Sequence, residues 1–305
     1  MKARSVPAVL GKKQNFLGID REMSSYGSSQ IVVLPVPYEH TVSYGGGTAR
    51  GPRAILDASR YVEYYDEELE TELCRKVGIS TLPPLNLAQS SGEKAILKIY
   101  EAVNRILADG KFVAVLGGEH TISQAPIRAH LEKYPDLSVV HVDAHADLRE
   151  SYEGSRFSHA CIMARVCEFM DPSRIVQAGI RALSPEEAEF IRTSGISTLY
   201  AHDIRAMGDW IPAVLPKLTD HVYVTFDVDG LDPSIMPSTG TPEPNGLFWA
   251  ETMKLLRLVG EQRSIVGFDV VEFAPNKTVQ HPDYTAAKLT YKLMNYAFNT
   301  QKGKR

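Results

Sequence analysis

The sequence predicts an α/β protein built on a parallel sheet with helices on both faces. Short β-branched, apolar runs alternate with amphipathic segments along almost the whole chain, as in parallel strands joined by helices. Charged and histidine-containing motifs follow the apolar runs, and ligands bind in such sheets at the carboxyl ends of the strands. The 305 residues contain no linker rich in proline, glycine and serine, so one domain is expected.

Composition and charge argue against several classes of protein. The chain is 44% hydrophobic and 23% charged, and its net charge of −4 gives no indication of a nucleic-acid partner. No apolar run approaches the length of a membrane span, and no signal segment opens the chain, so a cytoplasmic protein without a membrane partner is expected. Cys74, Cys161 and Cys167 have no paired spacing, which suits a reducing compartment.

The chain is expected to begin with an arm and a strand. Residues 1–30 are polar and irregular, and we expect an arm on the surface or on a neighbouring subunit, ahead of a single catalytic domain over 31–305. A β-rich run over 31–36, ended by Pro35 and Pro37, predicts the first strand.

The loop over 38–53 contains three consecutive glycines. No Lys-Ser or Lys-Thr pair follows them, so a nucleotide-binding loop is not favoured, and we interpret the segment as a rim over a substrate cleft. Pro52 suits the first turn of a helix that would run over 54–64.

The remaining elements continue the alternation. A helical stripe ended by Asp109-Gly110 predicts a helix over 91–108, and the Ser184–Glu187 run has the form of a capping box at a helix start. Further strands are expected at 111–116, 137–142, 175–180, 196–200, 222–226 and 264–271. Further helices are expected from 121 or 123 to 131 and at 158–170, 248–259 and 284–297.

The Val140–Glu150 stretch is the centre of the functional prediction. It continues an apolar run and places Asp143, His145 and Asp147 at every second position. Alternate side chains of an extended chain leave on the same face, so two carboxylates and an imidazole should converge where the strand ends. A strand end followed by an Asp-rich turn would also explain one such triplet.

A second carboxylate pair, Asp227 and Asp229, follows the apolar run 222–226. Two strands that end in inward carboxylates are costly unless something positive lies between them. Together with His120, which follows the strand at 111–116, the set has four carboxylates and two imidazoles, and two divalent cations would neutralise it. Mixed N/O ligation without thiolate suits Mn²⁺ better than structural zinc, and a metal pair can activate a water.

Four blocks of this sequence together resemble the signatures of the arginase–agmatinase (ureohydrolase) family. They are Gly117–His120 (GGEH), Asp143–Asp147 (DAHAD), Phe226–Pro233 (FDVDGLDP) and Asp269–Glu272 (DVVE). The resemblance extends from about residue 30 to 300. It implies a three-layer α/β/α fold with a parallel sheet of about eight strands, two Mn²⁺ per subunit and a homotrimer or homohexamer.

The resemblance also implies a role for each residue of the metal centre. One Mn²⁺ would be held by His120, Asp143, Asp147 and Asp227. The other would be held by Asp143, His145, Asp227 and Asp229. In the hydrolysis, Asp147 would accept the proton of the attacking water.

Three further residues match family positions that act on the substrate. His159 matches a histidine that shuttles a proton to the leaving amine, although an exposed histidine at a helix start would look the same. Glu272 matches the carboxylate that binds the guanidinium, with an ordinary salt bridge as its alternative. Thr241 matches a hydroxyl that helps to seat the same group, or is an ordinary turn residue.

The substrate implied is a guanidino compound without an α-carboxylate. Ser184 and Arg149 stand where arginases carry polar residues that read the α-amino and α-carboxylate groups. We therefore expect agmatine to be hydrolysed to putrescine and urea, a step of polyamine biosynthesis. Arg149 could instead seat the carboxylate of guanidinobutyrate, or be a solvated loop charge; guanidinopropionase and arginase activities are also alternatives.

Two alternatives come from other functional classes. A non-catalytic relative that binds partners would be expected to lose metal ligands, and a zinc deacetylase on a related fold would keep one metal site and fewer carboxylates. All six ligand positions are filled here, which disfavours both. The loops 38–53 and 148–157 are expected to set substrate length, and their shape cannot be derived from the sequence.

Overall fold

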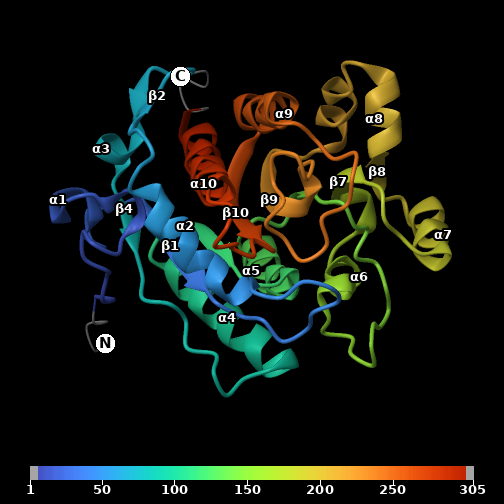
Figure 1. The fold of residues 1–305 in the computed structure, drawn as a ribbon, viewed down its shortest axis with the longest axis horizontal. Helices are drawn as coiled ribbons and strands as arrows, with labels where there is room; N and C mark the ends of the chain where they lie inside the picture. The colour runs from blue at the N-terminus through green and yellow to red at the C-terminus, as the bar shows by residue number, and fades with distance from the viewer. Residues whose placement is uncertain (1–5, 300–305) are drawn as a thin grey trace.

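The computed structural model describes residues 6–299. Its main feature is an eight-stranded sheet in the order β4-β1-β5-β10-β9-β6-β7-β8, in which neighbouring strands are parallel (Figure 1). The strands are β1 (Ile31–Val36), β4 (Ile79–Thr81), β5 (Phe112–Gly117), β6 (Ser138–Val142), β7 (Ile175–Ile180), β8 (Ser197–Tyr200), β9 (His221–Asp227) and β10 (Ser264–Val271). The predicted α/β class with a parallel sheet of about eight strands is confirmed.

Helices cover both faces of the sheet and complete the three layers (Figure 1). One face carries α2 (Gly51–Ser59), α8 (Ala201–Met207), α9 (Trp249–Gln262) and α10 (His281–Asn299). The other carries α4 (Gly92–Ala108), α5 (Gln124–Lys133) and α6 (Ile162–Cys167). The remaining elements are the ten-residue helix α7 (Pro185–Ser194), the short helices α1 (Arg21–Ser24) and α3 (Leu73–Val77), and the hairpin of β2 (Tyr65–Asp66) and β3 (Thr71–Glu72).

Several short elements were not predicted from the sequence. The edge strand β4 has three residues and the hairpin strands have two each, so they are too short to show a period of two. The seven-residue helix α8 begins directly after β8 without a capping hydrogen bond from a side chain. The helix expected over 54–64 is α2, which ends at Ser59.

The segment before β1 is not only a surface arm, as the sequence suggested. Phe16, Leu17 and Ile19 are buried and belong to the same apolar core as α2 and α10. The backbone N–H of Phe16 donates to Thr81 Oγ1 at 3.0 Å, and that of Leu17 donates to Ser59 Oγ at 2.8 Å. A short apolar run in a polar segment therefore packs into the domain; residues 1–5 of the expected arm lie outside the described residues.

The carboxyl ends of the central parallel strands lie side by side at one end of the sheet. There the chain leaves β5 through Gly118, where an added Cβ would lie 1.8 Å from the backbone oxygen of Tyr38. Only glycine allows this approach of the β1 loop to the β5 loop. The close contact draws the 38–53 loop over the strand ends, where the predicted functional residues lie.

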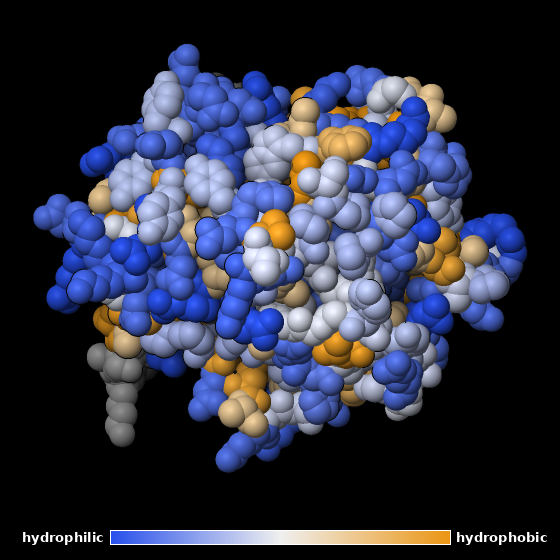
Figure 2. All heavy atoms as spheres, viewed as in Figure 1, coloured by the Kyte–Doolittle hydropathy of each residue, from blue (hydrophilic) through white to orange (hydrophobic). Residues whose placement is uncertain are grey.

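The outer surface is mostly polar on the face shown in Figure 2, where small apolar groups are scattered among hydrophilic residues. Isolated apolar side chains are normal on protein surfaces. Among the described residues, no helix combines the length and the apolar character needed to cross a bilayer.

A buried histidine lies in the core between α5 and the sheet. His130 Nδ1 donates to the carbonyl oxygen of Pro126 at 2.7 Å, and the ring packs against Tyr223. An added Cβ at Gly267 would lie 2.2 Å from His130 Nε2, so the glycine in β10 leaves room for the ring. Burial lowers the pKa of His130 to about 4.

We expect His130 to make the fold less stable in acid. Because its pKa is about 4 in the folded chain and 6.5 unfolded, its contribution to stability is complete above pH 6.5 and declines toward pH 4. At about 1.4 kcal/mol per pKa unit, the loss approaches ~3 kcal/mol. His130→Leu should therefore lose less stability than wild type between pH 6.5 and pH 4.5, measured by urea unfolding. The exposed His202, replaced by Gln, is the control; equal acid losses in His130→Leu and wild type would contradict this assignment.

Candidate metal centre

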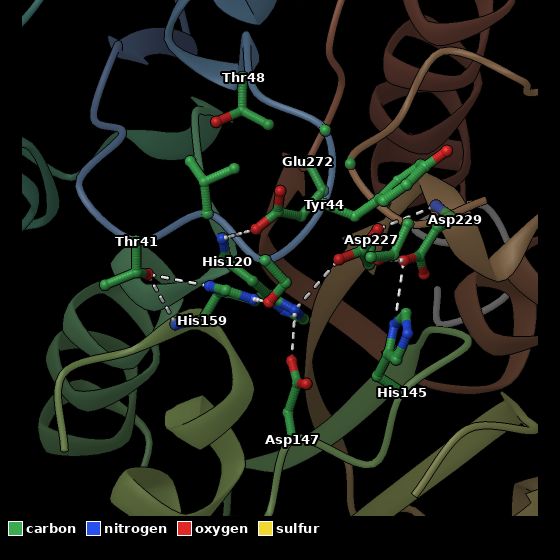
Figure 3. A pocket seen from close by; sticks show the side chains of 15 residues that line it. Thr41, Tyr44, Thr48, His120, His145, Asp147, His159, Asp227, Asp229 and Glu272 are labelled. Carbon is green, nitrogen blue, oxygen red and sulfur yellow. Dashed lines mark hydrogen bonds and ion pairs between the residues drawn. The ribbon is translucent and has the colours of Figure 1, made fainter. Parts of the chain in front are cut away.

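The predicted metal ligands converge at the carboxyl edge of the sheet. Asp143 follows β6 directly, and Asp227 ends the neighbouring strand β9, so the parallel register brings the two carboxylates together. His120 begins the short 3₁₀ turn after β5, and Glu272 follows β10. Figure 3 shows His120, Asp227 and Glu272 directed into one cavity from different strand ends.

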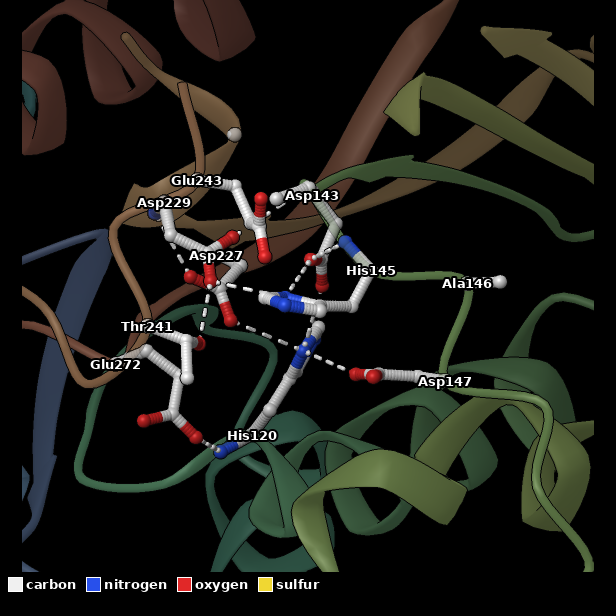
Figure 4. Close-up of polar contacts among 12 residues, drawn as sticks. His120, Asp143, His145, Ala146, Asp147, Asp227, Asp229, Thr241, Glu243 and Glu272 are labelled. Carbon is white, nitrogen blue, oxygen red and sulfur yellow. Dashed lines mark hydrogen bonds and ion pairs between the residues drawn. The ribbon is translucent and has the colours of Figure 1, made fainter. Parts of the chain in front are cut away.

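The ligand atoms form two groups that share Asp143. His120 Nδ1 lies 3.0 Å from Asp143 Oδ2, 3.1 Å from Asp147 Oδ2 and 3.4 Å from Asp227 Oδ2. His145 Nδ1 lies 3.0 Å from Asp229 Oδ2 and 3.5 Å from Asp143 Oδ1 (Figure 4). Asp227 Oδ1 accepts a hydrogen bond from the Asp229 backbone N–H at 2.8 Å. This bond is a second link between the residues around His120 and the residues around His145.

The protonation of His120 shows that this cluster fits a cation. His120 Nε2 lies 2.9 Å from Thr225 Oγ1, and Thr225 in turn donates its hydroxyl proton to Asp269 Oδ1 at 2.7 Å. Thr225 must therefore accept from Nε2–H, which leaves Nδ1 as the nitrogen that would offer its lone pair to a bound cation. Nδ1 is buried without a hydrogen-bond partner among the described residues and faces three carboxylates. A lone pair and carboxylates converge in this way on a metal ion.

The pKa shifts in the cavity show a shortage of positive charge. Burial and then the Asp143 carboxylate raise the pKa of Asp147 to about 6. Burial and then Asp229 raise the pKa of Asp227 well above its usual value. Burial lowers the pKa of His145, but the Asp229 and Asp143 carboxylates more than reverse this. Cations bound between these groups would lower the pKa of each carboxyl.

Asp147 and Glu272 adopt backbone conformations that are rare for residues other than glycine. Their φ angles are +55° and +59°. The Glu272 N–H donates to the Gly118 carbonyl oxygen at 2.9 Å, and its Oε1 accepts from the His120 N–H at 2.6 Å. The Asp147 carbonyl oxygen accepts from Met163 N–H at 2.9 Å. The surrounding structure thus holds both carboxylates in conformations of the kind that cluster at functional sites.

His159 is held by the loop over 38–53. Thr41 Oγ1 lies 2.9 Å from His159 Nδ1, and Ser43 Oγ lies 2.8 Å from Nε2. Glu119 anchors the loop because its carboxylate accepts from the N–H groups of His40 and Thr41, each at 2.6 Å, and from the Thr41 hydroxyl at 3.1 Å. The loop lines the cavity, as its interpretation as a rim requires. Sequence reasoning missed Thr41, Ser43 and Glu119, although Glu119 directly precedes the predicted ligand His120.

The remaining predicted residues divide between the cavity and its surroundings. Thr241 lines the cavity and donates to Asp229 Oδ2 at 3.4 Å. Arg149 is not among the residues that line it: its Nε lies 3.6 Å from Glu187 Oε2, and its guanidinium stands 5.2 Å from the Tyr152 ring centroid. Ser184 caps α7 in the predicted capping box, which is confirmed.

His141 is a buried polar residue of the centre that sequence reasoning missed. Its Nε2 lies 2.7 Å from Asp143 Oδ2. The signal was present, because His141 precedes Asp143, His145 and Asp147 in the same alternate spacing. A histidine inside an apolar strand is hard to distinguish from a core residue without its neighbours.

Comparison with known proteins establishes the family. Residues 29–295 match the model of the arginase family. This chain belongs to that family. It is 38% identical to the N(1)-aminopropylagmatine ureohydrolase of a Synechocystis strain, over 92% of this chain and 94% of the other. It is 37% identical to the agmatinase of Bacillus anthracis, over 86% of this chain and 88% of the other.

The fold is that of solved members of the arginase family. The agmatine ureohydrolase of Thermoplasma volcanium superposes with a TM-score of 0.83 and 32% identity, covering 92% of this chain and 93% of that one. The resemblance drawn from the four sequence blocks is therefore confirmed, and the protein is a hydrolase of the agmatinase-like branch. Its His/Asp cluster is a site that could bind metal ions.

We expect the Glu119 carboxylate to hold the 38–53 loop closed. Both backbone N–H groups donate to the same oxygen, Oε2, which the single oxygen of a glutamine can replace. The glutamine loses the negative charge that strengthens these two bonds, and its N–H₂ group faces the Thr41 hydroxyl where Oε1 was the acceptor. At ~1 kcal/mol per hydrogen bond, Glu119→Gln should raise the rate of chymotryptic cleavage after the exposed Tyr44 by about tenfold, measured by mass spectrometry of the fragments. The exposed Glu101, replaced by Gln, is the matched control; an unchanged cleavage rate in Glu119→Gln would exclude the anchor.

Proposed function

We propose that this protein hydrolyses the terminal guanidino group of agmatine and releases putrescine and urea. The observation that carries the proposal is the position of His120 Nδ1, which has no hydrogen-bond partner among the described residues and faces three buried carboxylates in the same cavity as Glu272. Two Mn²⁺ ions per subunit would occupy the groups that share Asp143. When bound, such ions would activate a water for attack on the guanidinium carbon.

The chain's own residues would supply the remaining functions. Glu272, whose pKa is raised well above its usual value by burial and by Glu119, would pair with the planar guanidinium, and that cation would restore its charged form. Asp147 would accept the proton of the attacking water. Thr241 would help to seat the guanidinium beside Asp229.

His159 would give a proton to the departing amine. Thr41 Oγ1 lies within hydrogen-bond distance of both Glu119 Oε1 and His159 Nδ1. If Thr41 donates to Glu119, it accepts from Nδ1–H, and Nε2 is the nitrogen that takes up and delivers the proton. Burial lowers the pKa of His159 to about 4, so the ring is neutral at pH 7. The neutral Nε2 can take up a proton within the cavity and pass it to the amine.

Agmatine suits this cavity better than arginine. Arg149 is directed to Glu187 and Tyr152 rather than into the cavity, and Ser184 is used as a helix cap. The two positions at which arginases read the α-substituents are thus not available for a carboxylate or an α-amino group. The guanidinobutyrate alternative loses its main support for the same reason.

N(1)-aminopropylagmatine is the second candidate substrate. Relatives that are 38% and 40% identical to this chain carry that name, whereas a 37% identical relative is named an agmatinase. Both substrates present the same guanidino group and differ in the tail that leaves the cavity. As further proposals, the protein acts in the cytoplasm, in polyamine biosynthesis, as a homotrimer or homohexamer, without nucleic-acid or membrane partners.

The substrate can be decided by steady-state assays of urea release with Mn²⁺. We expect kcat/KM for agmatine or N(1)-aminopropylagmatine to exceed that for arginine, guanidinobutyrate and guanidinopropionate by at least ~100-fold, because a buried carboxylate without a partner costs several kcal/mol. A preference for arginine would reject the proposed substrate class. Release of acetate from acetylated polyamines without urea would reject the reaction.

Replacement of His120 tests the metal assignment. His120→Asn removes the Nδ1 lone pair, so we expect weaker binding of one Mn²⁺, by more than the ~10–100-fold typical when only an outer partner of a ligand is lost. Equilibrium dialysis against MnCl₂ measures the stoichiometry, and urea release should fall with it. The exposed His202, replaced by Asn, is the control. Full Mn²⁺ binding and full activity in His120→Asn would refute the assignment.

A further inference from the structure

One row of polar residues crosses the apolar sheet directly below the metal centre. The parallel register pairs Asp269 with Thr225, Thr225 with His141, His141 with Gln177 and Gln177 with Thr198, on five adjacent strands from β10 to β8. The first four are fully buried. Buried polar side chains in an apolar sheet are costly unless their hydrogen bonds are satisfied, so this row requires a physical explanation.

The hydrogen bonds of the row determine where its protons lie. Gln177 Nε2 donates to the carbonyl oxygen of Ala146 at 2.8 Å, and its Oε1 accepts from the Thr198 hydroxyl at 2.8 Å, which fixes the orientation of the amide. The same Nε2 lies 3.0 Å from His141 Nδ1, which must therefore accept. The proton of the neutral ring is then on Nε2, and it is donated to Asp143 Oδ2 at 2.7 Å.

His141 is therefore an outer partner of the metal centre rather than a ligand. One ring nitrogen accepts from Gln177, and the other donates to Asp143, so neither offers a lone pair to an ion. We propose that His141, oriented by Gln177 and Thr198, is a positioning residue that holds Asp143, the carboxylate shared by the two groups of ligands. The inference rests on the metal centre of the proposed function.

The chemistry of the row explains why a neutral donor stands at this position. A hydrogen bond from His141 fixes the Asp143 carboxylate without adding charge to the cluster. A lysine or arginine would hold the carboxylate equally well but would repel the cations that the site binds. On the other side of the row, Asp269 and Thr225 fix the tautomer of His120 in the same way. The row thus orients one carboxylate, Asp143, and one imidazole, His120, of the proposed metal ligands.

The proposal predicts how replacements of His141 change metal binding. His141→Phe keeps the ring but removes the donor, so we expect the Mn²⁺ dissociation constant to rise by ~10–100-fold. The rise in melting temperature on adding MnCl₂ should shrink accordingly, measured from the melting temperature of the metal-free variant itself. His141→Gln should restore most of the affinity, because its amide N–H can reach Asp143. Equilibrium dialysis and thermal unfolding, each with and without MnCl₂, measure both quantities.

A matched variant separates positioning from general loss of stability. His130→Leu removes an equally buried histidine outside the centre, and it should change the melting temperature without changing Mn²⁺ affinity. Should His141→Phe fail to fold, Gln177→Leu takes its place: it leaves Nδ1 without a donor and should weaken Mn²⁺ binding by at least ~10-fold. Unchanged Mn²⁺ affinity in these variants, or a Mn²⁺ affinity of His141→Gln no higher than that of His141→Phe, would overturn this inference and leave the proposed function standing. A wild-type protein that binds no Mn²⁺ would instead contradict the proposed function.

Discussion

The structure depends on the concentration of negative charge around one imidazole at the carboxyl ends of the strands. His120 Nδ1 faces Asp143, Asp147 and Asp227, and Glu272 lines the same cavity. Such an arrangement would oppose folding if nothing positive were bound, because buried carboxylates are expensive to desolvate. The arrangement fits a site that could bind cations, and the sheet holds its side chains in place.

The parallel sheet provides most of that support. Adjacent strands end together, so Asp143 after β6 and Asp227 at the end of β9 meet without any special loop. Glycines let the surrounding turns approach: an added Cβ at Gly51 would lie 2.4 Å from the backbone oxygen of Phe273, next to Glu272. Two residues below Asp143 and Asp227 along their strands, the polar row fixes the hydrogen bonds of His120 and His141. Ligand geometry is thus set by strand register and by hydrogen bonds within the sheet rather than by mobile loops.

The loops over 38–53 and 148–157 position side chains outside the sheet. The 38–53 loop contacts both ring nitrogens of His159 and is anchored by Glu119, so it couples closure of the cavity to the orientation of the proposed proton donor. The start of the 148–157 loop turns the Arg149 side chain toward Glu187 and away from the cavity. The centre that would activate water therefore lies on the strand ends, whereas the loops outside the sheet line or flank the cavity.

Most of the architecture could be predicted from the sequence. Seven of the strands were located because buried parallel strands are continuous apolar runs, whereas the three-residue strand β4 and the short helix α8 carry too little pattern. The alternate spacing of Asp143, His145 and Asp147 predicted their convergence for the same geometric reason. Phe16 and Leu17 were misplaced on the surface because a brief apolar run in a polar segment gives no periodic signal.

The sequence by itself determined the fold class, the six converging side chains proposed as metal ligands and the family, because these follow from local periodicity and from motifs at strand ends. Only the tertiary structure decided the tautomers of His120 and His141, the contact of the 38–53 loop with His159 and the direction of Arg149. Each of these depends on partners that are tens to hundreds of residues away in the chain. Their positions are set by strand register and loop packing, which no local pattern records.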